Sequence, residues 1–199
     1  MFIIIAAPVL SHITGELTLA ISLHLCILTN AVFKNTKIYL TVINRYPYRG
    51  QGPMIKIEYP PYRPRIKEEA GKELIFDEAR KQWVALTPEE WVRQNFLQYL
   101  LQVKKYPASL IAIEKEIKLG ELKKRFDIVV YDKDTKPWMI IECKEMGVVL
   151  DEKVLNQVLR YNITLNVPYL VITNGNFCMA LAVSNGDLTE INNLPAVFL

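Results

Sequence analysis

The stretch RFDIVVYDKDTKPWMIIECK, residues 125–144, decides the fold of this 199-residue chain, because it joins two apolar runs through a polar segment. The runs RFDIVVY (125–131) and PWMIIEC (137–143) are rich in β-branched and aromatic residues and lack helical periodicity. The DKDTK segment between them is typical of a turn. We therefore expect a β-hairpin whose turn is centred near Asp134 and Thr135.

The pairing of this hairpin brings charged side chains together. With that turn, Asp127 lies opposite residues 141–142, where cross-strand Cβ atoms are about 5 Å apart. Glu142 and Lys144 are two residues apart on one strand, so they share a face and meet Asp127. Buried charges are costly unless they are paired or bind a metal. The hairpin therefore predicts two carboxylates and one ammonium at the edge of an apolar sheet.

These groups suit metal-dependent phosphodiester hydrolysis. Mg²⁺ prefers oxygen ligands and keeps several waters, and Mn²⁺ is expected to substitute for it. Asp127 and Glu142 would be metal ligands, with the backbone carbonyl of Cys143 as a third. Lys144 would hold the attacking water or stabilise charge on the phosphate. The alternative interpretation is a simple ion pair between Lys144 and either acid on a solvated face.

Histidine and cysteine usage narrows the chemistry. Both histidines, His12 and His24, precede residue 54, which excludes Ser-His catalysis and His-ligated zinc from the rest of the chain. The three cysteines share no CxxC spacing, which is typical of a reducing compartment rather than a disulfide framework.

Charge is distributed unevenly along the chain. Residues 1–53 carry four basic residues against one acid, whereas residues 54–199 carry twenty of each sign. The longer segment therefore lacks the basic surplus of a self-sufficient DNA-binding protein. If it acts on DNA, we expect a partner to help hold the strand.

Residues 1–53 differ from the remainder in composition. Residues 1–33 are apolar, with Glu16 as their only charge. Three interpretations are open: a membrane-spanning helix, a buried additional element, or a start placed too early, with Met54 as the true start, which we favour. We therefore predict an apolar N-terminal extension (1–53) and one folded domain (54–199). We expect a cytoplasmic protein, tethered to a membrane only if residues 1–33 are translated.

The remaining elements follow from capping and periodicity. Thr87-Pro88-Glu89-Glu90 predicts a helix start in which Thr87 caps and Glu90 completes a capping box. This helix should end before Pro107. The other expected elements are, in chain order, a hairpin at 72–76 and 81–86, a strand at 110–117, a turn at Gly120, a helix from Asp151 stopped by Pro168, and strands at 169–173 and 176–183 joined by Asn174-Gly175.

This set of motifs resembles a known group of enzymes. Asp127, followed after fourteen residues by Glu142-Cys143-Lys144, resembles the motif of the PD-(D/E)XK nuclease superfamily. Over about residues 54–185, the chain resembles the N-terminal nuclease domain of type I restriction enzyme R subunits. The strings that carry this likeness are TPEEWVRQ (87–94), KKRFDIVVYD (123–132), IIECKE (140–145), NQVLRYN (156–162) and PYLVITNG (168–175). The resemblance implies an α/β fold with a restriction-endonuclease-like αβββαβ core, in which helices flank a central mixed sheet.

The resemblance also implies functional residues. It makes Asp127 and Glu142 metal ligands and Lys144 the catalytic lysine. Arg125, two residues before Asp127, would contact phosphate.

Further residues match the family less specifically. Gln157 and Tyr161 match a Gln-x-x-x-Tyr motif that would orient the active site or contact DNA, and their i,i+4 spacing places them on one helix face. A polar helix residue and a half-buried tyrosine are the alternative interpretation. Glu90 matches a first-helix glutamate used as an outer metal ligand, and the capping box explains it equally well.

We therefore expect an Mg²⁺-dependent endodeoxyribonuclease of the restriction–modification type, without a helicase motor. The sequence contains no GxxxxGK[ST] motif, so no nucleotide cofactor is expected. The expected partners are DNA and other restriction or helicase subunits. The alternative is a nuclease fold that does not cleave and serves as a binding or scaffold module in a restriction or defence complex, as the zero net charge of residues 54–199 suggests.

Overall fold

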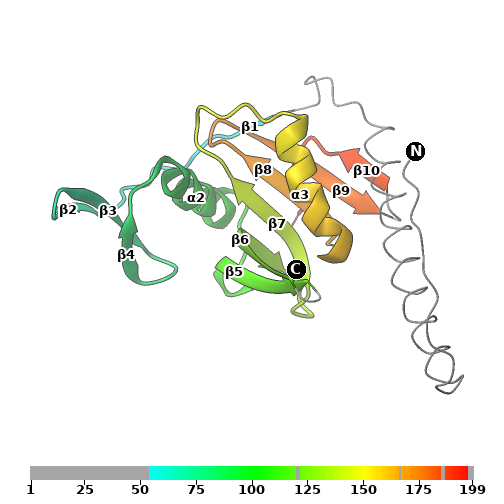
Figure 1. Cartoon of the computed structure of the whole chain (residues 1–199), viewed down its shortest axis with the longest axis horizontal. Coiled ribbons are helices and arrows are strands. Elements are labelled where there is room, and N and C mark those ends of the chain that lie inside the picture. Colours follow the sequence, from blue (N-terminus) through cyan, green and yellow to red (C-terminus); the bar gives the residue numbers. More distant parts are fainter. Residues whose placement is uncertain (1–53, 120–121, 166, 185–186, 197–199) are drawn as a thin grey trace, which may run out of the picture. The chain divides into compact units, whose positions relative to one another are not determined.

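The computed structural model describes residues 54–119, 122–165, 167–184 and 187–196 (Figure 1). The predicted boundary at residue 53, the interpretations of residues 1–33 and the turn at Gly120 lie outside these ranges. Within them, no helix is both long and apolar enough to cross a bilayer.

A mixed sheet forms the centre of the described domain. Its strands are β1 (Ile55–Lys56), β5 (Ile111–Leu119), β6 (Leu122–Tyr131), β7 (Pro137–Cys143), β8 (Tyr169–Thr173), β9 (Phe177–Ser184) and β10 (Asp187–Glu190). They are ordered β1-β9-β8-β7-β6-β5, and β10 pairs with β9. Strands β5, β6 and β7 are antiparallel neighbours, whereas β7 and β8 run parallel.

Two helices cover opposite faces of this sheet. They are α2 (Pro88–Gln98), which continues as a π-helical turn (Tyr99–Val103), and α3 (Glu152–Leu165), the crossover between β7 and β8. One apolar core joins α2 to the sheet through Val92, Phe96, Leu100, Ile128, Met139 and Ile141. The other joins α3 through Leu155, Val158, Leu159, Val129, Ile140 and Leu170. The order α2-β5-β6-β7-α3-β8 confirms the predicted αβββαβ core.

A short 3₁₀ turn (Ala108–Leu110) leads into β5, and a second, smaller sheet precedes α2. The smaller sheet contains β2 (Ile66–Glu69), β3 (Lys72–Asp77) and β4 (Gln82–Ala85). Strands β3 and β4 form the predicted hairpin. The sequence analysis did not predict strands β1, β2 and β10.

The start of α2 agrees with the sequence prediction in part. The Thr87 Oγ1 accepts a hydrogen bond from the Glu90 N–H at 3.0 Å, as a cap should. The Thr87 N–H, however, donates to the Ala85 carbonyl at 3.0 Å. The predicted capping box is therefore wrong in its reciprocal half. The Glu90 carboxylate instead accepts from Arg80 and Arg93, because guanidinium donors make stronger, charge-assisted hydrogen bonds than a backbone amide.

The hairpin turn at Asn174-Gly175 is confirmed. The Asn174 Oδ1 accepts hydrogen bonds from the N–H groups of Asn176 and Phe177, both at 3.1 Å. Gly175 has a φ of +89°, and a Cβ there would lie only 3.1 Å from the Val92 Cγ2. Both the backbone conformation and the packing against α2 therefore require glycine at this position.

A buried ionic network ties the smaller sheet to α2. Asp77 is 0% and Arg93 2% exposed. The Asp77 carboxylate accepts from the Arg93 Nη2 and, at 2.5 Å, from the Arg80 Nε. Burial alone would raise the pKa of Asp77, but Arg93 and Arg80 hold it below its usual value. Asp77 therefore stays ionised and joins the end of β3 to the middle of α2.

Replacement of Asp77 by asparagine should strongly destabilise the domain. Asp77→Asn keeps the shape of the side chain but leaves the buried Arg93 with less compensating charge. We expect the free energy of unfolding in urea at pH 7 to fall by roughly 3–5 kcal/mol. Glu78→Gln is the control, because Glu78 makes an exposed ion pair with Arg65, and it should change stability little.

The effect of Asp77→Asn should also depend on pH. Because the folded-state pKa of Asp77 is lowered, its contribution is present above the unfolded value of about 3.9 and is lost as the pH falls toward the folded value. The stability difference between wild type and Asp77→Asn should therefore shrink below about pH 4. A difference that stays constant down to acid unfolding would contradict the assigned role of Asp77.

Candidate active site

The register of β6 and β7 places two acidic residues side by side. Ile128 pairs with Ile141 in this antiparallel ladder. Continued by one residue, the register sets Asp127 opposite Glu142, which agrees with the pairing expected from the turn. The Asp127 Oδ2 accepts a hydrogen bond from the Cys143 N–H at 2.7 Å. The first carboxylate is thus held against the backbone of the strand that carries the second.

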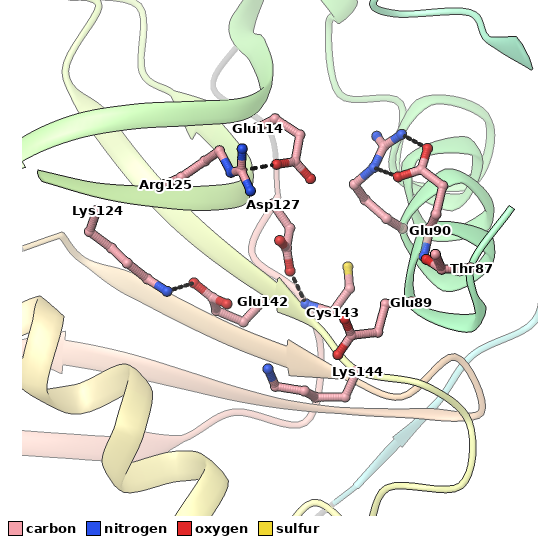
Figure 2. A pocket seen from close by; sticks show the side chains of 11 residues that line it. Thr87, Glu89, Glu90, Glu114, Lys124, Arg125, Asp127, Glu142, Cys143 and Lys144 are labelled. Carbon is pink, nitrogen blue, oxygen red and sulfur yellow. Dashed lines mark hydrogen bonds and ion pairs between the residues drawn. The ribbon is translucent and has the colours of Figure 1, made fainter. Parts of the chain in front are cut away.

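A polar cleft of about 310 Å³ lies beside these residues (Figure 2). Its lining comes from the start of α2 and from β5, β6 and the end of β7. The lining residues are Thr87, Glu89, Glu90, Arg93, Glu114, Lys124, Arg125, Asp127, Glu142, Cys143 and Lys144. The structure therefore brings Asp127, Glu142 and Lys144 to one cleft, together with Glu90 and Arg125.

Glu142 is a buried acid without full compensation. It is 6% exposed, and its Oε1 has no hydrogen-bond partner. The Lys124 Nζ lies 3.8 Å from this oxygen, which is an ion-pair distance rather than a hydrogen bond. Burial, and then the nearby Asp127 charge, raise the pKa of Glu142 to about 7. Lys124 and Lys144 lower this pKa, but they compensate the buried charge of Glu142 only in part.

Asp127 has a similar but better satisfied environment. Burial raises its pKa, and the negative charge of Glu89 acts in the same direction. The hydrogen bond from the Cys143 N–H and the positive Lys144 act in the opposite direction. Lys144 is half-buried, and its charge lowers the pKa of both acids. The two carboxylates and the ammonium thus interact electrostatically with one another.

This donor set fits a magnesium ion. Two adjacent desolvated carboxylates, one with an unpartnered oxygen, are stabilised by a divalent cation. In the described ranges, no three His, Cys, Asp or Glu side chains converge as a ready-made metal cluster. Mg²⁺ usually binds through one or two carboxylates and keeps several waters, so two acids suffice. The Cys143 carbonyl as a third ligand stays a prediction.

The two glutamates at the start of α2 have different surroundings. The Glu90 carboxylate accepts from Arg80, Arg93 and Gln94 at 3.0, 2.9 and 2.8 Å, so its oxygens are already occupied. Glu89 instead extends toward Cys143 and Lys144 (Figure 2). The sequence analysis did not single out Glu89. Its position in the first helical turn was visible in the sequence, but only the packing of α2 decides which neighbour faces the cleft.

Strand irregularity brings further charged groups to the cleft. The β5–β6 ladder skips Glu114, which has a φ of 51°. The register is the same on both sides of Glu114 and sets this residue opposite Asp127. Arg125 is predominantly exposed, and its Nε pairs with the Glu114 Oε2 at 2.9 Å. Glu114 and Lys124 are thus cleft residues that the sequence analysis did not select.

The predicted Gln157–Tyr161 pair is only partly described. Gln157 lies on the exposed side of α3 and does not line the cleft. The side chain of Tyr161 lies outside the described residues. The role of this pair in orienting the site or contacting DNA therefore stays a prediction.

Comparison with known proteins identifies the family. No curated protein and no solved structure matches the chain significantly. The family model described as type I restriction enzyme R protein N terminus (HSDR_N) matches residues 88–195, which is more than half of the chain. The match runs from the start of α2 past β10 and includes Asp127, Glu142 and Lys144. The chain therefore belongs to the type I restriction enzyme R protein N-terminal family.

Proposed function

We propose that this domain is a PD-(D/E)XK endonuclease that hydrolyses phosphodiester bonds in DNA with Mg²⁺, or with Mn²⁺ in its place. The observation that carries the proposal is the buried Glu142 carboxylate, whose Oε1 has no hydrogen-bond partner, beside Asp127 and Lys144 in one cleft. Membership of the restriction-enzyme family supports the same chemistry.

Each residue of the site has a role in this proposal. Asp127 and Glu142 would hold the ion, with the Cys143 carbonyl as a further ligand. When bound, Mg²⁺ would lower the pKa of a coordinated water and neutralise charge on the phosphate. Lys144, on the strand that carries Glu142, would hold the attacking water and stabilise the negative charge that develops on the phosphate. The Cys143 N–H keeps the Asp127 carboxylate in place for this geometry.

The proposed biological setting follows from the family. DNA and other restriction or helicase subunits are the proposed partners, and the cytoplasm is the proposed compartment. The second candidate function is a module that keeps the nuclease fold without cleaving. The equal numbers of acidic and basic residues in 54–199 favour it, because such a domain has no general attraction to DNA.

Lys144→Ala should abolish cleavage. Loss of one group that stabilises transition-state charge costs at least about 100-fold in rate. The measurement is nicking of supercoiled plasmid by the full chain with Mg²⁺ or Mn²⁺. Lys133→Ala, an exposed lysine in the β6–β7 turn, is the matched control and should retain activity. Equal activity of wild type and Lys144→Ala would end the nuclease proposal.

Glu142→Gln should weaken metal binding. Substitutions outside the ligand sphere already cost tenfold or more in affinity, so loss of a direct ligand should cost at least about tenfold. Calorimetric titration with Mn²⁺ and Mg²⁺ measures this directly. Glu145→Gln, an exposed acid three residues away, should bind metal like the wild type. A wild-type protein that binds neither ion would favour the non-cleaving module.

Glu89→Gln and Glu90→Gln should have different effects. Glu89 faces the cleft, so Glu89→Gln should lower metal affinity and cleavage while leaving stability unchanged. Glu90 compensates the buried Arg93, so Glu90→Gln should lower the free energy of unfolding by about 1.5–3 kcal/mol. Urea unfolding and calorimetry of both variants make the comparison. Loss of metal binding in Glu90→Gln at unchanged stability would reverse this assignment.

A further inference from the structure

The two faces of the smaller sheet differ in what they carry. In antiparallel pairing, residues directly opposite each other share a face. The pairs Ile66–Ile75, Glu68–Glu73, Ile75–Val84 and Asp77–Gln82 therefore define one face, here called the inner face. The pairs Lys67–Leu74, Glu69–Lys72, Phe76–Trp83 and Leu74–Ala85 define the other, here called the outer face.

The inner face meets α2 at Asp77, whereas Ile66 on the same face is 46% exposed. Ile75 and Asp77 are both 0% exposed, and Asp77 binds Arg93 of α2. Because Asp77 is directed toward α2, the side chains of the opposite, outer face are directed away from this helix. Its side chains remain accessible in the described structure: Trp83 is 38% exposed, and the Arg65 and Lys67 side chains are 57% and 38% exposed.

The outer face combines aromatic rings with cations. Phe76 and Trp83 pack edge to face, with ring centroids 5.4 Å apart. The Arg65 guanidinium lies 3.7 Å from the Phe76 centroid, and the Lys67 Nζ lies 4.8 Å from the Trp83 centroid. This interleaving of rings and positive charges is the surface that unpaired bases and their phosphates require.

Charge is also segregated between the faces. Arg65, Lys67 and Lys72 stand on the outer face with the acid Glu69, and at its edge the acid Glu78 pairs with Arg65 and with a further base, Lys81. The acids on the inner face are Glu68, Glu73 and Asp77. A sheet that is nearly neutral as a whole thus presents a positive, aromatic surface on one side only.

We propose that the outer face of the smaller sheet binds single-stranded DNA. Trp83 and Phe76 would stack on unpaired bases, and Arg65 and Lys67 would contact the phosphates on either side. The present partners of these cations, Glu78 and Glu69, form exposed ion pairs, which are weak enough to exchange for phosphate. In a duplex the bases already stack on each other, so the rings select an unpaired strand. The inference rests on the proposed function for the choice of DNA.

The outer face is connected directly to the cleft. Strand β4 ends at Ala85, and two residues later Thr87 lines the cleft as the cap of α2. The network of Asp77, Arg80, Glu90 and Arg93 holds the smaller sheet to the same helix. A DNA strand bound by the smaller sheet would thus be held by a structure that is attached to α2, the helix that positions Glu89. The positive charge of the outer face would then attract DNA, although residues 54–199 as a whole have no net positive charge.

The test measures, by fluorescence anisotropy, the binding of a fluorescein-labelled thymidine 20-mer to the full chain. EDTA is present so that no metal-dependent cleavage occurs. Trp83→Leu should weaken binding about tenfold, whereas Trp83→Phe, which keeps a ring, should retain most of the affinity. The double variant Arg65→Gln/Lys67→Gln should reduce the dependence of log affinity on log salt by about 1.4, the value for two phosphate contacts. The corresponding duplex should bind more weakly than the single strand.

Matched controls exclude general effects. Phe177→Leu removes an equally exposed aromatic residue (39%) from β9, and Lys133→Gln/Lys136→Gln removes two exposed charges from the β6–β7 turn. Both controls should bind like the wild type, and circular dichroism with urea unfolding checks that every variant is folded. Unchanged binding in Trp83→Leu would overturn the proposal. The same result is expected if residues 1–53 or another protein cover the outer face, and the proposal would then be wrong as well.

The proposal of DNA binding by the outer face and the nuclease proposal can be contradicted independently of each other. If the outer-face variants lose binding in EDTA while no protein cleaves DNA with Mg²⁺ or Mn²⁺, the inference stands and the nuclease proposal falls. If the wild type cleaves and the outer-face variants bind and cleave equally well, the nuclease proposal stands and the inference falls.

Discussion

The end of β7 is held from both sides by hydrogen bonds that its backbone amides donate, and the candidate chemistry depends on this arrangement. The Cys143 N–H donates to the Asp127 carboxylate of β6, and the next amide, that of Lys144, donates to the carbonyl of Thr173 at the end of β8 at 2.7 Å. Glu142 therefore has little freedom to turn toward water, because the strand that carries it is fixed between its neighbours. The apolar cores on both faces remove solvent, so the acids are close and desolvated. This is the condition under which carboxylates favour a divalent cation.

A second constraint acts through the helix rather than the sheet. Arg93 is buried in the middle of α2, and its charge is met by Asp77 from the smaller sheet and Glu90 from its own helix. Such a network adds little net stability compared with apolar packing, but loss of one member leaves an uncompensated charge. Its structural effect is to fix the rotation of α2. That rotation commits Glu90 to the arginines and leaves Glu89 facing the cleft, so fold stability and site geometry share one set of contacts.

The sequence was sufficient to predict the structure wherever one local rule dominated. The β6–β7 register followed from a short polar turn between apolar runs, and Asp151 caps α3 through the N–H groups of Lys153 and Val154. The sequence was insufficient wherever several hydrogen-bond partners competed for the same group. Glu90 had a backbone amide and two guanidinium groups within reach, and only the folded arrangement selects the guanidinium groups. The positive φ of Glu114 has no local signature in the sequence, because an acid in an alternating strand is typical of an ordinary exposed position.

The balance of charges in residues 54–199 is informative only when it is resolved in space. Twenty acids and twenty bases cancel in the sum, yet the acids are not spread evenly. Several acids converge on the cleft, where a cation would meet them, and others lie on the inner face of the smaller sheet or in its ionic network. The outer face is left with a local positive excess.

Because salt screens exposed charges beyond about 10 Å at ordinary ionic strength, a DNA strand would respond to this local pattern of charges and not to the net charge of the domain. Zero net charge is therefore compatible with an acidic metal site and a basic DNA-binding surface in one domain.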